Sequence, residues 1–307
     1  MVKFKDNTKA VAALGAFISS FLWSTAFVAI KIGYRYYSGQ FTFAGIRFFL
    51  AGVILLLFSI KKIRIFFKNF KVLFLIGFFQ IFIGYAVFYT ALKYIDATVS
   101  SIIVGGSPVT TALVSHIVLK DDKLSRNKII SLILGFIGIL VVVAGTAKGG
   151  SSGNNSMFIL SLLGVFLLIL NQVINALVNI FVAKKSMGIN PVIINGGQLF
   201  IGGALLILLG YFAKEEQNFM QFQPPLIMAI AWLVFVSTFA FTIWYTILQK
   251  KIMTVSELNI WKFITPVCGA VLAFLLLREI PNVYTIIGLL LVVLSLFFNS
   301  RTQRKIK

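Results

Sequence analysis

Long apolar runs recur along the whole chain and constrain its fold more than any other feature of the sequence. Hydrophobic residues make up 59% of the 307 residues, charged residues only 12%, and the mean hydropathy is +0.99. Soluble domains carry roughly twice that share of charge. We therefore expect the chain to lie in a lipid bilayer, where a helix of about 20 apolar residues spans the hydrocarbon core.

The apolar runs are numerous enough for ten spanning helices, and no inserted soluble domain is expected. Charged residues or turn residues separate them. The predicted spans are 10–32, 41–60, 72–92, 97–119, 128–147, 157–178, 191–213, 225–249, 253–277 and 281–299. The first run is too long for the core of a signal peptide and is expected to remain as a span. The sequence thus predicts an all-α integral membrane protein.

Lysine and arginine residues gather at alternate ends of these spans. With a cytoplasmic N-terminus, 20 of the 28 basic residues fall in inner segments and 6 in outer ones. Cytoplasmic loops of membrane proteins carry such an excess. Both termini are therefore expected in the cytoplasm of a prokaryotic cell, with the chain in its plasma membrane. The formal charge of +20 arises from these clusters and does not indicate a nucleic-acid partner.

Two stretches whose prolines lie 158 positions apart repeat one pattern. TVSSIIVGGSPVTTALVSHIVLKDD contains Pro108, TVSELNIWKFITPVCGAVLAFLLLRE contains Pro266, and each proline precedes an acidic residue by 13 positions. A linker rich in Gly, Ser and Asn divides the spans five and five. Because five is odd, the second half must have the opposite orientation, as in many secondary transporters. The predicted organisation is a first half at 1–147, an external linker at 148–156, a second half at 157–300 and a basic cytoplasmic tail at 301–307.

Five segments, three of which overlap the repeated stretches, carry a family resemblance. They read WSTAFVAIK, AGIRFFLAG, GYAVFYTALKYIDATVSS, GSPVTTALVSHIVLKDDKLS and ITPVCGAVLAFLLLRE. The chain, from about residue 10 to 299, resembles the tandem EamA-like domains of the drug/metabolite transporter superfamily. The resemblance implies two inverted five-helix halves around a central cavity, and usually the export of amino acids or other small metabolites. Asp121 and Asp122 stand where the family has one acidic residue, so either is the counterpart of Glu279.

Lys262 is the most deeply embedded charge of the predicted spans. At a rise of 1.5 Å per residue it lies about 13 Å into its span, where a lysine is costly in lipid. It is expected either to face a cavity and bind an anionic substrate group, or to snorkel or bond to carbonyl groups freed by Pro266. Glu257 is the candidate for ion coupling, or else an interfacial first-turn residue. Asn259 is a further substrate-binding candidate in the same segment.

Polar and aromatic residues in other spans supply the remaining candidates for substrate binding. Asn171, Asn175 and Asn179 follow each other at helical spacing and form one polar stripe, which cannot face lipid cheaply. The stripe either lines a cavity or hydrogen-bonds to neighbouring helices. The other candidates, for which core packing is the alternative, are Gln172, Trp23, Gln80, Tyr85, Tyr89, Trp244 and Tyr245.

A last group of residues is expected to have structural or hinge roles, namely Arg47, Gly105, Gly106, Pro108 and Pro266. Arg47 is shallow enough to snorkel but is also a plausible structural anchor. The single cysteine and single histidine exclude a disulfide framework and a metal cluster. No cofactor is expected, and no ATP-binding loop or paired catalytic groups are present.

The expected partners are the bilayer and a small-molecule substrate, and the expected state is a monomer or weak homodimer. An exchanger or importer of phosphorylated or nucleotide-linked sugars is the alternative function, with a membrane-embedded enzyme as a remote one. The sugar transporter should show a larger cluster of basic residues in its cavity than Lys262 alone.

Overall fold

The computed structural model describes residues 6–118, 155–185, 188–215, 223–250, 258 and 261–305, with short pieces between 126 and 141. Every element in these ranges is helical. Six helices are long and apolar enough to cross a membrane, namely Thr8–Tyr36, Gln40–Phe58, Phe70–Tyr94, Ile159–Val182, Pro191–Phe212 and Pro224–Gln249. Shorter apolar helices cover Ile264–Leu277 and Val283–Ser295. The all-α membrane class is therefore confirmed, and six of the predicted spans coincide with these long helices.

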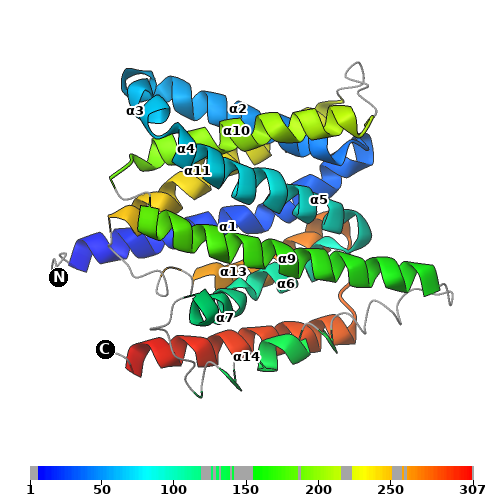
Figure 1. The fold of residues 1–307 in the computed structure, drawn as a ribbon. Coiled ribbons are helices and arrows are strands. Elements are labelled where there is room, and N and C mark those ends of the chain that lie inside the picture. Colours follow the sequence, from blue (N-terminus) through cyan, green and yellow to red (C-terminus); the bar gives the residue numbers. More distant parts are fainter. Residues whose placement is uncertain are drawn as a thin grey trace.

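The helices lie side by side with their ends gathered at two opposite faces (Figure 1). The elements are α1 (Asp6–Tyr36), α2 (Gln40–Phe58), η1 (Ile60–Lys62), α3 (Ile63–Lys68), α4 (Phe70–Ile76), η2 (Gly77–Ile83), α5 (Gly84–Tyr94), α6 (Ala97–Gly105), α7 (Ser107–Val118), α9 (Asn155–Lys185), α10 (Pro191–Phe212), α11 (Pro224–Gln249), η4 (Trp261–Phe263), α13 (Ile264–Leu272), η5 (Ala273–Leu277) and α14 (Val283–Lys305). The start of α1 and the end of α14 lie at the same face, on the left of the view.

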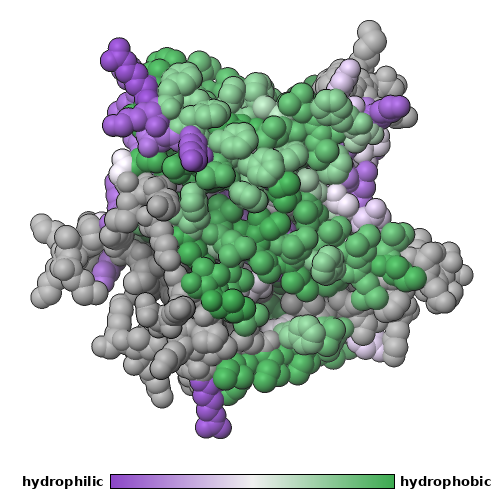
Figure 2. Space-filling model, viewed as in Figure 1, coloured by the Kyte–Doolittle hydropathy of each residue, from purple (hydrophilic) through white to green (hydrophobic). Residues whose placement is uncertain are grey.

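The surface carries an apolar band between two polar ends. Figure 2 shows hydrophobic residues covering the middle of the visible face, with most hydrophilic ones at the ends of the helices. Several large apolar side chains are strongly exposed, among them Phe58 at 85% and Met228 at 71%. Exposed apolar surface of this extent fits contact with lipid. The exposed basic residues of α3 and its neighbours stand at one polar end.

Glycines let α2 and α10 pack with their backbones in contact. A Cβ added to any of four glycines would meet the other helix. Gly45 faces Ile207, Gly52 faces Phe200, Gly203 faces Phe49 and Gly196 faces Leu56. Residues later in α2 contact residues earlier in α10, so the two helices are antiparallel. A shift of 151 residues maps Gly52 onto Gly203 and Phe49 onto Phe200, which makes the contacts reciprocal. Reciprocity of this kind marks a twofold relation, and the stacked rings of Phe49 and Phe200, 5.0 Å apart, lie at its centre.

The predicted span 97–119 is two helices rather than one. Helix α6 ends at Gly105 and α7 begins at Ser107, with Gly106 in a turn between them. The physical cause is Pro108, which lacks an N–H group and is best accommodated in the first turn of a new helix. The close approach of α13 adds to the need for a small residue, because a Cβ on Gly105 would lie 2.5 Å from the Pro266 ring.

Two glutamates from late in the chain cap helices from early in the chain. Glu215 accepts hydrogen bonds from the backbone N–H groups of Phe41 and Thr42 and from the Thr42 hydroxyl, at 2.9, 2.8 and 2.8 Å. Glu279 accepts the same three bonds from Ala97 and Thr98, at 3.0, 2.9 and 2.8 Å. The first N–H groups of a helix have no partner within it. The two carboxylates therefore fasten the starts of α2 and α6 to the ends of α10 and η5.

Candidate functional site

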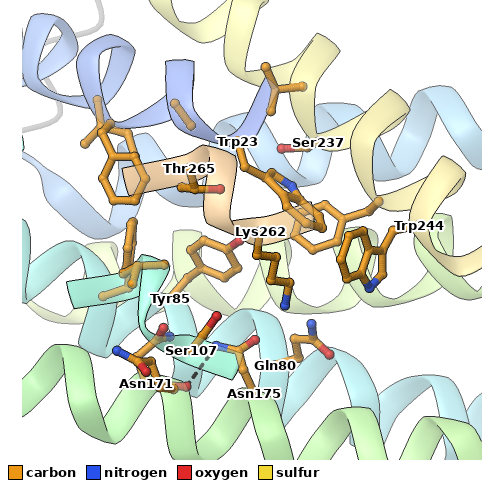
Figure 3. A pocket seen from close by; sticks show the side chains of 18 of the residues that line it. Trp23, Gln80, Tyr85, Ser107, Asn171, Asn175, Ser237, Trp244, Lys262 and Thr265 are labelled. Atoms are coloured by element: carbon orange, nitrogen blue, oxygen red, sulfur yellow. Dashed lines mark hydrogen bonds between the residues drawn. The ribbon is translucent and has the colours of Figure 1, made fainter. Parts of the chain in front are cut away.

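A central cavity of about 140 Å³ lies where α1, η2, α5, α9, α11 and η4 converge beside the break between α6 and α7. One wall is aromatic and apolar, formed mainly by Trp23, Phe27, Phe88, Phe241 and Trp244. The opposite wall is formed by the amide side chains of α9, namely Asn171, Gln172, Asn175 and Asn179. Figure 3 shows Lys262 reaching from η4 into the space between the tryptophans and the amides. The cavity is thus amphipathic, with a cation at its centre.

The Lys262 ammonium group lies against aromatic rings. Its Nζ is 4.9 Å from the ring centroid of Trp244 and 5.7 Å from that of Trp23. A lysine over a tryptophan face is attracted by the ring quadrupole. Lys262 lies in η4, a single 3₁₀ turn before α13, and its side chain points across the cavity. The structure therefore places Lys262 in the cavity and not at the membrane surface.

Arg47 also lines the cavity, and it does not snorkel to the end of α2. The side chain is only 3% exposed, with its guanidinium 4.0 Å from the ring of Phe48, 5.3 Å from Tyr89 and 5.4 Å from Tyr85. Among the described residues, its Nε has no hydrogen-bond partner. Tyr85 lines the cavity, as predicted, whereas Tyr89 is fully buried behind it and is not among the lining residues.

The amides of α9 both line the cavity and bond to neighbouring helices. Asn171 donates to the carbonyl of Gly84 at 2.7 Å, and Gln172 donates to the carbonyl of Ile103 at 2.8 Å. Asn175 donates to the carbonyl of Asn171 at 2.8 Å. Gly84 follows the π-helical segment η2, and Ile103 lies in the last turn of α6, where its carbonyl also accepts from the Gly106 N–H at 3.0 Å. The two alternatives considered for the stripe therefore hold together.

Tyr245 and Gln80 connect the cavity to a buried polar network that includes two residues missing from the predicted site. The Tyr245 hydroxyl lies 3.2 Å from Gln198 Oε1 and 3.4 Å from Gln80 Oε1, and one proton can serve only one of them. Gln198 donates to Asn195, which donates to Thr242 on α11. Asn195 and Gln198 are fully buried. Their polarity within an apolar span was the sequence signal that could have identified them.

The phenylalanines of the cavity were also missed, since the chain contains 32 of them. The repeat offers the signal that could have found them. A shift of 156 residues maps Tyr89 onto Tyr245, Phe88 onto Trp244 and Tyr85 onto Phe241. All of these except Tyr89 line the cavity.

The remaining predicted residues fall into two groups. Glu257 and Asn259 lie outside the described residues. Gly105, Gly106, Pro108 and Pro266 surround the helix break, and their neighbours Val104, Ser107 and Thr265 line the cavity. Within the described ranges, no cluster of His, Cys, Asp and Glu could hold a metal ion.

A second, outer cavity of about 520 Å³ lies near the capped start of α6, and Lys31, Asp96 and Glu279 line it. Lys31 donates to the carbonyl groups of Leu92 and Ile95 at 2.7 and 2.6 Å. Asp96 is solvent-exposed, yet protein surrounds its carboxyl group on several sides. Burial, followed by the charge of Glu279, raises the pKa of Asp96, while Lys31 opposes the shift.

Comparison with known proteins identifies the family of this chain. The sequence profile of the EamA-like transporter family matches residues 10–144 and again residues 162–301. An uncharacterized transporter of Archaeoglobus fulgidus is 24% identical over 282 residues, covering 92% of this chain and 95% of that protein. The uncharacterized transporter YvbV of Bacillus subtilis is 27% identical over 263 residues, covering 85% and 82%.

The fold also matches a solved crystal structure, with a TM-score of 0.70 and 18% identity over 97% of this chain and 99% of the other. A likeness at that identity concerns the fold alone. Two family matches over most of the chain accompany the apolar helices of a multi-pass membrane protein. The chain therefore belongs to the EamA-like transporter family of the drug/metabolite transporter superfamily, which is a family of membrane transporters and not of enzymes.

Proposed function

We propose that this protein is a secondary transporter that exports an amino acid or a related small metabolite through its central cavity. The observation that carries the proposal is the cavity itself, which joins an aromatic wall, an amide wall and a lysine in the middle of a membrane protein. Ligand sites of secondary transporters lie near the bilayer midplane, often where helices are broken. The outward direction follows the export role usual in the family.

The proposed architecture has ten spans in two inverted halves, at 1–147 and 157–300, with both termini in the cytoplasm. The reciprocal, antiparallel contacts of α2 and α10 support it, since inverted repeats produce such a twofold relation. The start of α1 and the end of α14 lie at one face, where the basic cluster around α3 also stands. Both features fit the excess of positive charge expected on the cytoplasmic side.

Alternating access requires the halves to rock about this site. The caps made by Glu215 and Glu279 join the ends of helices from the second half to the starts of helices from the first. In the proposed orientation both caps lie on the outer side, where they hold the two halves together. Opening outward would break these bonds, and the cavity would then release its solute.

Glu257 is the proposed coupling residue, because it is the only carboxylate expected within a span. Burial raises the pKa of a carboxylate, so its protonation could accompany each transport cycle. A pH profile of transport that is the same in Glu257→Gln and in the parent would remove this role.

Transport of phosphorylated or nucleotide-linked sugars has less support. Two basic residues, Lys262 and Arg47, line the described cavity, which is one more than expected and is in favour of this alternative. Its volume of about 140 Å³, however, is close to that of an engineered cavity that holds benzene, which is much smaller than a nucleotide sugar.

Flux in proteoliposomes tests the proposed function. Labelled amino acids and related carboxylate metabolites would be offered to the parent protein, to Lys262→Ala and to Lys71→Ala, whose lysine is exposed at the start of α4. We expect flux with the parent and with Lys71→Ala, and loss of at least tenfold with Lys262→Ala. Absence of flux for every solute, in protein that is folded and inserted, would reject the proposal.

A further inference from the structure

The charges around the central cavity are unbalanced. Arg47 and Lys262 line it, and none of the described residues on its wall is acidic. Aromatic rings surround both cations, with Trp244 and Trp23 beside Lys262 and Phe48 beside Arg47. A ring face attracts a cation but does not neutralise its charge. The described part of the wall is therefore short of negative charge, which an anionic solute would supply.

The amide wall offers little compensation for a positive charge carried by the solute. Asn171, Gln172 and Asn175 each donate one amide N–H to a backbone carbonyl. Gln172 Oε1 also accepts the hydroxyl proton of Thr110, at 2.7 Å. A solute therefore meets the second N–H of each amide and the side-chain carbonyl oxygens of Asn171 and Asn175. The oxygens can accept a hydrogen bond from a hydroxyl or amine, but they carry no full charge to set against an ammonium group.

The size and polarity of the cavity limit the rest of the solute. A volume of about 140 Å³ is similar to the cavity of about 150 Å³ that holds one benzene ring in another protein. The Trp23 ring lies 4.9 Å from the Trp244 ring and 5.2 Å from the Phe241 ring, between centroids, and the three rings form an apolar face. A solute with one ring or a comparable aliphatic group would cover this face and leave its polar group beside Lys262.

We propose that the central cavity selects small organic monoanions, of about single-ring size, over zwitterions and cations of the same size. The anionic group pairs with Lys262, and the apolar part lies against Trp23, Phe241 and Trp244. The inference rests on the proposed transport function and narrows its substrate class. Within the metabolites considered above, it favours carboxylates without an amino group over the amino acids themselves.

Binding to four related probes tests this preference. Benzoate, phenylglycine, benzyl alcohol and benzylamine share one ring and are respectively anionic, zwitterionic, neutral and cationic at pH 7. Titration calorimetry with the full chain in nanodiscs would measure the affinity of each. We expect benzoate to bind at least tenfold more tightly than phenylglycine or benzyl alcohol, and benzylamine to bind most weakly.

Variants at one position assign the preference to Lys262. In Lys262→Gln the affinity for benzoate should fall to that for benzyl alcohol, whose unchanged affinity shows that the ring site is intact. Lys262→Arg should restore most of the preference for benzoate. The inference is overturned if phenylglycine or benzylamine binds as tightly as benzoate, if benzoate does not bind, or if Lys262→Gln keeps the preference.

The two proposals fail in different ways. If amino acids are carried in the flux assay and phenylglycine is the preferred probe, the transport function stands and the anion selectivity is wrong. If benzoate binds with the expected dependence on Lys262 but no solute is ever carried, the selectivity stands and the transport function is wrong.

Discussion

Replacing Glu279 with alanine should loosen the start of α6. The change removes the acceptor of three hydrogen bonds of 2.8 to 3.0 Å, from two backbone N–H groups and the Thr98 hydroxyl. A hydrogen bond to a charged group contributes roughly 1.5–3 kcal/mol, which would give a large total if the donors stayed dry. The outer cavity of about 520 Å³ borders Glu279, however, and water can enter there.

The expected loss is therefore close to that of a helix N-cap, about 1–2 kcal/mol. At roughly 2–4 °C per kcal/mol for a chain of this size, the melting temperature should fall by about 2–8 °C. Tryptophan fluorescence of the detergent-solubilised protein on heating would measure the change. Ile280→Ala is the matched control, because this neighbouring side chain is 84% exposed.

A double-mutant cycle with Thr98→Val separates the cap from general damage. Thr98→Val alone removes one of the three donors, and in the Glu279→Ala background the same change should cost much less. Residues in direct contact typically show coupling of about 0.5–3 kcal/mol. Equal costs of Thr98→Val in both backgrounds, or a Glu279→Ala protein that melts with the parent, would refute the cap as a source of stability.

Three further changes have expected outcomes. Gly52→Leu should lower thermal stability by at least about 1–3 kcal/mol, because the Phe200 backbone occupies the space that a Cβ would need. Gln172→Leu should lower it by about 1–3 kcal/mol, since the carbonyl of Ile103 loses a buried donor. Asp96→Asn concerns pH: because the pKa of Asp96 is raised on folding, the ionised carboxylate disfavours the folded state above that pKa. The variant should melt slightly higher than the parent at pH 7, by less than about 1 kcal/mol in this solvated setting, and the difference should vanish as the pH falls through the raised pKa.

Several features could be predicted from the sequence because their causes are local. A run of apolar residues is a property of consecutive positions, so the long helices from α1 to α11 were predicted within a few residues. The polar stripe of α9 follows from helical spacing alone, and it does face the cavity. From the depth of Lys262 in its span we likewise expected it in a cavity, and it lines one. These predictions concern location; substrate binding by the same residues stays a prediction.

Other features depend on which helices become neighbours. Arg47 was expected to serve the fold, but the rings that surround it come partly from α5, and only their packing brings the guanidinium to the cavity. The same packing buries Tyr89 behind Tyr85. Gly105, Gly106 and Pro108 were expected as structural or hinge positions. The division of this span into two helices was not predicted, because prolines also occur in continuous membrane helices.

The sequence by itself determined the membrane location, the helical class, the doubling of the pattern and the polar positions within apolar spans, because composition, periodicity and spacing encode them directly. Only the tertiary structure decided which of those positions meet. Glu215 lies 173 residues from Thr42, and Glu279 lies 181 residues from Thr98. Bonds across such separations depend on how antiparallel helices pack across their glycine contacts, and no local pattern specifies that.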